Sequence, residues 1–157
     1  MKVIIIIICL FPKQRKPKTR EEPLVNENFI ILELFKQKVF CCCPGQKHQH
    51  IIEFHQGDVW TITNEQKYDD VLGWHFLVAV NREFQFLIQV DDIEKLFSEG
   101  RICSILDLEL KIIHLNHQVN KALDEHDKES FSLYVNELSN AKKVIDNGYF
   151  SVGIQAF

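Results

Sequence analysis

The residues best suited to chemistry in this 157-residue chain are cysteines and histidines on either side of one predicted turn. Three consecutive cysteines precede Pro44 and Gly45, and three histidines follow within ten residues of the turn. If the flanking segments pair as a hairpin, thiolates and imidazoles approach one another, and zinc takes four such ligands in a tetrahedron. The cluster comprises Cys41, Cys42, Cys43, His48, His50 and His55, of which Cys41, Cys43, His48 and His50 are the candidate zinc ligands.

The spacing within this cluster leaves a second interpretation open. It contains no Cys-x-x-Cys or His-x-x-x-His pair, and consecutive residues of a strand point to opposite faces, so at most two of the three thiolates converge easily. The alternative is a turn flanked by cysteines, with its histidines on the surface. Five cysteines, three of them adjacent, do not suit a disulfide framework and favour reduced thiols in the cytoplasm.

Two groups of carboxylates offer a further chemical hypothesis, because clustered acids can hold magnesium or act as acid–base partners. Asp58 lies near His55 in the sequence, and Asp69 and Asp70 lie near His75. A nuclease built on them needs a basic surface, which a net charge of −4 does not provide. We therefore expect turn residues here, and the enzyme hypothesis is the weaker one.

Changes in composition and the positions of prolines divide the chain into parts. Hydrophobic residues make up 46% and charged residues 25%, as in globular proteins. The apolar run Val3–Phe11 is too short to cross a bilayer, which needs about 20 residues. It is interpreted as a buried strand, a targeting segment or a poorly ordered start. The basic segment Pro12–Pro23 has three prolines and reads as a linker. The expected parts are residues 1–23 (start and linker), 24–100 (sheet), 101–147 (helical hairpin) and 148–157 (tail).

Alternating apolar residues predict an antiparallel sheet of four to five strands between Phe29 and Val90. The clearest pair flanks Asn81: Trp74–Val80 and Phe84–Val90 each place every second residue on one apolar face, which indicates a hairpin. The remaining strands are expected over residues 29–40, 51–54 and 59–63.

The last third of the chain is predicted to be helical. A short helix should begin at Asp91 and Asp92, read as its cap, and stop at Gly100. Apolar residues then recur in steps of three and four in two runs, with Asp127 as the second N-cap and Gly148 after its end. Two such seams joined by a short connection fold back on each other, so the fold class is α+β. The seam residues are Ile105, Leu108, Ile112, Leu115, Val119 and Ala122, then Phe131, Tyr134, Leu138, Ala141 and Ile145.

The segment Val119–Phe131 resembles the core of the IDEAL domain of Gram-positive bacteria, named for an Ile-Asp-Glu-Ala-Leu string. Ala122 and Leu123 match the end of that string, and Glu137-Leu138-Ser139 also fits, whereas positions 119–121 read Val-Asn-Lys in place of Ile-Asp-Glu. The resemblance covers about residues 107–147, and the N-terminal region resembles no family. It implies a helical module of small cytosolic bacterial or phage proteins, without assigned catalytic residues, in which some members look like proteolysis adaptors.

These observations predict a non-enzymatic protein–protein interaction module, a regulatory or adaptor protein of bacterial or phage origin. The alternative is a small metal-binding protein or metal-dependent enzyme that uses residues 41–55, with zinc as its cofactor. The partner is expected to be another protein or a second copy of the chain, with neither nucleic acid nor membrane involved. Because the seam occupies the inner face of the hairpin, contact should fall on outer residues near the connector: Lys121, Glu125, His126, Lys128 and Glu129, with Leu133 and Val135 as apolar anchors.

Overall fold

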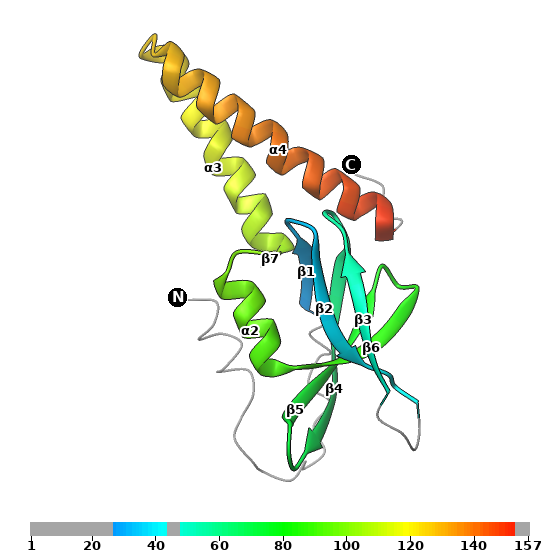
Figure 1. Ribbon diagram of the computed structural model, residues 1–157. Coiled ribbons are helices and arrows are strands. Elements are labelled where there is room, and N and C mark those ends of the chain that lie inside the picture. The colour runs from blue at the N-terminus through cyan, green and yellow to red at the C-terminus, as the bar shows by residue number, and fades with distance from the viewer. Residues whose placement is uncertain (1–26, 44–47, 153–157) are drawn as a thin grey trace, which may run out of the picture.

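The centre of the molecule is a seven-stranded antiparallel sheet, seen in a computed structural model that describes residues 27–43 and 48–152 (Figure 1). The strand order is β3-β2-β6-β5-β4-β1-β7. The helices follow the first six strands in the chain, with β7 between α2 and α3, so the α+β class is confirmed. The predicted apolar run, linker and Pro44-Gly45 turn lie outside the described residues. The strands are β1 (Glu27–Ile31), β2 (Phe35–Phe40), β3 (Gln49–Phe54), β4 (Val59–Asp69), β5 (Gly73–Val80), β6 (Phe84–Gln89) and β7 (Ile102–Ser104).

The predicted count of four to five strands is too low, for two reasons. Residues 29–40 form two strands rather than one, because the chain leaves the sheet between Leu32 and Leu34. There the Leu32 amide donates to the Arg101 carbonyl at 2.8 Å, beside β7. β7 pairs antiparallel with β1 but has only three residues, too few to show a period of two in the sequence.

The strand β4 is also longer than the predicted 59–63. It continues to Asp69, with a shift of register against β5 between Ile62 and Gln66. Such a shift marks a β-bulge, and the Thr63 hydroxyl donates to the Leu77 carbonyl at 3.0 Å within it. The polar residues after the bulge hide the second half of the strand from any search for apolar alternation. The predicted hairpin of β5 and β6 is confirmed, with Val80 paired to Phe84.

The short helix α2 (Val90–Ser98) is where it was expected, but its cap is not. Gln89 occupies the N-cap position and makes no side-chain cap bond. Asp91 and Asp92 lie within the first turn instead, where the unpaired amides of the helix start favour negative charge. The prediction of an Asp cap is therefore wrong. Gly100 follows the helix with a φ of 72°, a conformation that glycine adopts without strain, as its predicted role as a stop requires.

One face of the sheet carries an aromatic core around Trp60, which is completely buried. Its ring lies 4.9 Å from Phe54, 5.5 Å from Phe86 and 5.9 Å from Phe35, measured between ring centroids, each in an edge-on arrangement. Such contacts add about 0.5–1.5 kcal/mol per pair to the burial of area. The two buried apolar residues of α2 join this cluster, so α2 covers the same face.

The helices α3 (Ile105–Asp124) and α4 (Lys128–Val152) form the predicted antiparallel hairpin, which projects from one end of the sheet (Figure 1). Every predicted seam position is buried or half-buried. Asp127 caps α4, since its Oδ1 accepts from the Glu129 and Ser130 amides at 3.1 Å. That bonding, above all with Ser130, lowers the pKa of the Asp127 carboxyl.

Gly148 does not end α4, as the sequence suggested, but lies inside it at the point where the hairpin meets the sheet. A Cβ there would come within 2.5 Å of Ile30 Cδ1 and 3.3 Å of Val59 Cγ2. Glycine is therefore required for close approach rather than for a turn. Ile30 and Val59 belong to a second core with the seam residues, so the base of the hairpin and the sheet are packed together.

Candidate interaction surface

The structure bonds two of the clustered cysteines to each other. Cys41 and Cys43 form a disulfide with their Cα atoms 5.4 Å apart, whereas Cys42 is exposed and free. Cys41 and Cys43 both follow the end of β2 at Phe40, where the chain is no longer part of a strand. Partial burial and the Glu65 carboxylate raise the pKa of Cys42. The hairpin brings His48 next to Cys41, since the Cys41 amide donates to the His48 carbonyl at 2.8 Å. His55 is not brought near, because it follows Phe54, which pairs with Phe35 at the other end of the hairpin.

The thiols were expected to be reduced, and in this disulfide form Cys41 and Cys43 are not available to zinc. The other two candidate ligands, His48 and His50, are exposed at β3, an edge strand of the sheet. Within residues 27–43 and 48–152, no group of three or more His, Cys, Asp or Glu is arranged to hold a metal ion. The zinc hypothesis stays a prediction for the reduced protein.

The acid–base candidates hold turns in place. Asp58 accepts from the His55 amide at 2.7 Å and from Asn81 Nδ2 at 2.9 Å, which ties the β3–β4 turn to the β5–β6 turn. Asp69 accepts from backbone amides of the β4–β5 turn, and the buried His75 ring lies with its Nδ1 3.0 Å from the Gly73 carbonyl at the start of β5. These contacts use both groups in the way expected of turn residues.

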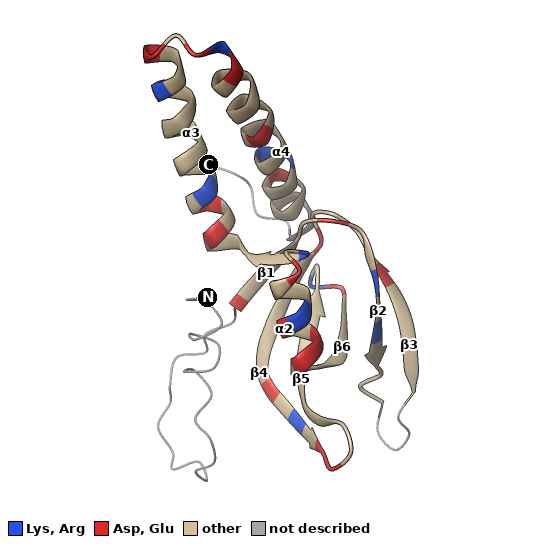
Figure 2. Ribbon diagram, turned by 60° about the vertical axis from the view of Figure 1, so that its left-hand side comes forward, with Lys and Arg blue, Asp and Glu red and all other residues tan. Residues whose placement is uncertain are grey.

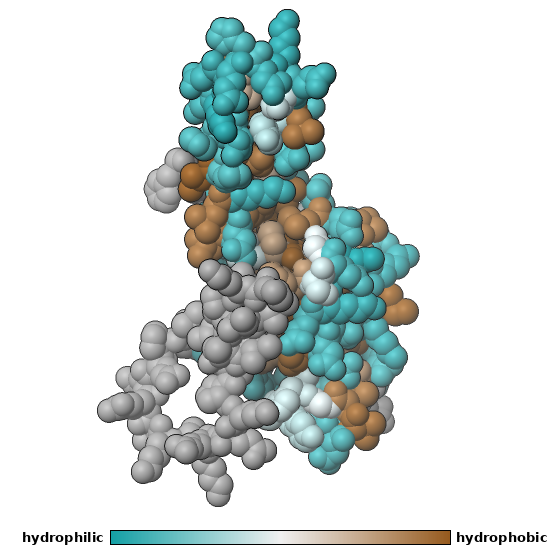
Figure 3. All heavy atoms as spheres, turned by 90° about the vertical axis from the view of Figure 1, so that its left-hand side faces the viewer, coloured by the Kyte–Doolittle hydropathy of each residue, from teal (hydrophilic) through white to brown (hydrophobic). Residues whose placement is uncertain are grey.

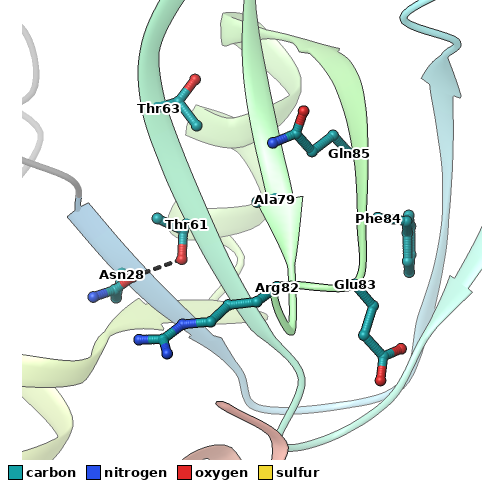
Figure 4. A pocket seen from close by; sticks show the side chains of 8 residues that line it. All are labelled: Asn28, Thr61, Thr63, Ala79, Arg82, Glu83, Phe84 and Gln85. Atoms are coloured by element: carbon teal, nitrogen blue, oxygen red, sulfur yellow. Dashed lines mark hydrogen bonds between the residues drawn. The ribbon is translucent and has the colours of Figure 1, made fainter.

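A hollow of about 660 Å³ lies on the face of the sheet away from Trp60 (Figure 4). Its floor is polar, and the Thr61 hydroxyl donates to Asn28 Oδ1 at 2.7 Å across it. Arg82 and Glu83 supply the charged groups of its rim, and among the described residues no His, Cys or Asp lines it. Such a surface can form hydrogen bonds but offers no nucleophile with an adjacent base. The lining residues are Asn28, Thr61, Thr63, Ala79, Arg82, Glu83, Phe84 and Gln85.

The predicted charged partner residues lie at the outer end of the hairpin, where both signs of charge are interspersed (Figure 2). All five are exposed: Lys121, Glu125, His126, Lys128 and Glu129. Lys121 Nζ and Glu125 Oε1 are 3.9 Å apart, and an exposed pair of this kind contributes about 0–1 kcal/mol. His126 has a φ of 58°, so the connector holds a non-glycine residue in the left-handed region.

The two predicted apolar anchors do not share a surface. Leu133 is 54% exposed and Val135 is 36% exposed. They stand two residues apart on α4, which at 3.6 residues per turn separates their directions by about 200°. A single partner surface therefore meets one of them, and neither has another strongly exposed apolar neighbour three or four residues away on α4.

A larger apolar feature that the sequence analysis missed lies on α3. Leu106, Leu110 and Ile113 are 64%, 54% and 64% exposed, and their spacing of four and three places them on one face. We call these three residues the α3 stripe. The stripe points about half a turn away from the buried Leu108 and Leu115. Viewed from the α3 side, apolar side chains gather along the lower part of the hairpin (Figure 3).

In the sequence, two sets of apolar residues follow the helical spacing of three and four residues, one set for the seam and one for the α3 stripe. Ile105 and Leu106 are adjacent apolar residues, as are Ile112 and Ile113. The first member of each pair belongs to the seam, and the second therefore faces away from it. When a helix is apolar on two faces and one is packed in the seam, the other face either packs against a further surface or stays exposed to water.

A groove of about 380 Å³ lies at the base of the hairpin between α3, α4 and the chain after β1. Leu32, Leu108 and Val144 give it an apolar floor, and Asp107, Lys111 and Glu137 stand among its polar residues. Cys103 also lines it, and burial raises the pKa of that thiol to about 11. A thiol with so high a pKa is a poor nucleophile, so the groove is suited to packing rather than to covalent chemistry.

Known proteins give no direct guide to this surface. Neither the protein-family models, nor the curated proteins, nor the solved structures include a match to the chain. The resemblance of residues 107–147 to the IDEAL domain accordingly stays a prediction. Within the part of the chain that the structure describes, no helix is long and apolar enough to cross a membrane.

Proposed function

We propose that this protein is a non-enzymatic interaction module, a regulatory or adaptor protein that holds a protein partner on its helical hairpin. One observation carries the proposal: the α3 stripe leaves three large aliphatic side chains in water on a helix whose other face is already packed. An exposed contiguous apolar patch of this kind is typical of a protein interaction site.

The charged end of the hairpin supplements the stripe. Lys121, Glu125, His126, Lys128 and Glu129 surround the connector and belong to no apolar core. Rim charges of this kind raise the rate of association and discriminate between partners, while apolar groups provide most of the affinity. The proposed contact therefore runs from the α3 stripe toward the connector, in a cytoplasmic protein whose hairpin resembles a bacterial and phage module.

The experiment is a comparison of captured proteins between the wild type and matched variants. Full-length protein is immobilised and exposed to an extract of cells that carry the gene, and bound proteins are quantified by mass spectrometry. Leu110→Ser should remove the specifically captured protein, because it places a hydroxyl in the middle of the stripe. Ile51→Ser is the control, since Ile51 is an aliphatic residue 74% exposed on β3, away from the hairpin.

Two results would contradict the proposal. Capture that survives both Leu110→Ser and Ile113→Ser would move the contact away from the α3 stripe. Equal loss with Ile51→Ser would show that any exposed aliphatic residue retains proteins nonspecifically. The circular dichroism spectrum of each variant checks that the helices remain. We expect it to be unchanged, because none of the three substitutions removes a buried side chain.

A further inference from the structure

The hairpin of β4 and β5 extends beyond the rest of the sheet and ends at the opposite end of the molecule from the α3–α4 hairpin (Figure 1). Tyr68 pairs with Trp74 across this extension, while the pairing of β5 with β6 begins only at His75. Val71 is 89% exposed, Tyr68 56% and Trp74 49%. Together with Leu72 these residues form what we call the β4–β5 tip.

Hydrogen bonds brace the β4–β5 tip. Asp69 Oδ1 accepts from the Val71 amide at 2.9 Å and from the Leu72 amide at 3.1 Å. Gln89 Nε2 donates to the Leu72 carbonyl at 2.9 Å, which ties the turn to β6. The rings of Tyr68 and Trp74 lie 5.1 Å apart. A loop that is already ordered loses little further entropy on binding, so its apolar groups contribute more of their energy to affinity.

The surroundings of the tip are acidic. Glu65, Asp69 and Asp70 stand on the extension with a single lysine, Lys67. Two more carboxylates, at residues 91 and 92, follow closely after Gln89, the residue bonded to the turn. Figure 2 shows red segments both at this tip and at the adjacent start of α2. Carboxylates repel anionic lipid headgroups and attract lysine and arginine, and a cation stacks favourably on the face of tryptophan or tyrosine.

We propose that the β4–β5 tip is a second docking surface, which binds a protein segment carrying arginine or lysine beside an apolar side chain. The cation lies against the Tyr68 and Trp74 rings with Asp70 nearby, and the apolar side chain packs on Val71. Tryptophan and tyrosine are the residues most enriched where a few side chains dominate binding. This surface is separate from the α3 stripe, so the proposal goes beyond the hairpin contact and does not depend on it.

The test is a selection of peptides from a random phage-displayed library on immobilised full-length protein. We expect selected sequences to be rich in arginine or lysine next to an aliphatic or aromatic residue. A synthetic peptide of the selected sequence is then titrated against the variants. Trp74→Ala should weaken its binding about 10-fold or more, as expected for a central aromatic contact. Asp70→Lys should weaken it several-fold, and added salt should reduce the affinity of the wild type.

Matched variants keep the test decisive. Phe84→Ala removes a half-exposed aromatic ring elsewhere on the sheet and should leave peptide affinity unchanged, as should Ile51→Ser on β3. If Trp74→Ala melts early, Val71→Ser serves instead, because Val71 is almost fully exposed. Peptides that are acidic or uncharged, or binding indifferent to both Trp74 and Val71, would overturn the proposal. Trp74-dependent binding to phosphatidylserine vesicles would overturn it in favour of a membrane surface.

Discussion

The packing of the hairpin can be tested by a pair of substitutions two residues apart on α3. Leu115 is 3% exposed and belongs to the core shared with the sheet, whereas Ile113 is 64% exposed on the α3 stripe. Leu115→Ala removes buried methyl groups and leaves a cavity, at a cost of about 3 kcal/mol within the usual range for such changes. In a chain of this size that corresponds to a fall in melting temperature of roughly 6–12 °C.

Ile113→Ala should behave differently, although it removes a side chain of the same size. The Ile113 side chain is already largely in water, so little burial is lost, and alanine favours the helix by a few tenths of a kcal/mol. We expect its melting temperature to stay within about 2 °C of the wild type. Both variants are compared by thermal denaturation followed by far-ultraviolet circular dichroism at one protein concentration. Equal shifts for the two variants, or a shift below about 2 °C for Leu115→Ala, would refute the assignment of the seam.

Three further predictions concern single sites. Tyr149 donates a hydrogen bond to Glu109, and that bond, with desolvation and nearby carboxylates, raises the pKa of Tyr149 from 10.0 to about 12. Because the pKa of Tyr149 is higher in the folded state, the bond stabilises the fold fully below the unfolded pKa, and this stabilisation is lost as pH rises through the folded pKa. The wild type should therefore melt at a higher temperature than Tyr149→Phe at neutral pH, and the two melting temperatures should converge in strong alkali. His126→Gly should raise the free energy of unfolding by roughly 1 kcal/mol, because the connector needs a positive φ at this position. A lower melting temperature for this variant would mean that the bond from the His126 ring to the Leu123 carbonyl matters more. Metal analysis of protein purified without reductant should find no stoichiometric zinc, since Cys41 and Cys43 are bonded to each other, and stoichiometric zinc would revive the four-ligand site.

The sequence predicted those elements whose apolar period runs unbroken. The hairpin of β5 and β6 and the seam of α3 and α4 were found because each apolar residue recurs at the spacing of its own element. The break after β1 could not be found in this way, since Leu32 and Leu34 are apolar yet lie outside the strands. The continuation of β4 past its bulge is hidden for the opposite reason, because a polar strand leaves no apolar pattern.

The sequence analysis missed the α3 stripe, and the cause is physical. A period of three and four residues identifies a helix face but does not say what covers that face. The α3 stripe has the same spacing as the seam, and only the position of α4 shows which of the two faces is packed. Val135 and Leu133 were chosen for lying beside the seam, but residues at i and i+2 do not share a helix face. Gly148 looked like a helix end because contact with Ile30 and Val59 is not visible in the sequence.

The two proposed surfaces are joined by one strand. β4 begins at Val59, which packs against the hairpin, and its other end carries Tyr68 of the β4–β5 tip, roughly 30 Å along an extended chain. Its second residue, Trp60, faces the opposite core, so each side of the strand is anchored in a different cluster. A hinge between hairpin and sheet would have to pull Val59 or Gly148 out of close contact. Partners bound at the two ends would therefore be held at a fixed separation, which is the property that an adaptor requires.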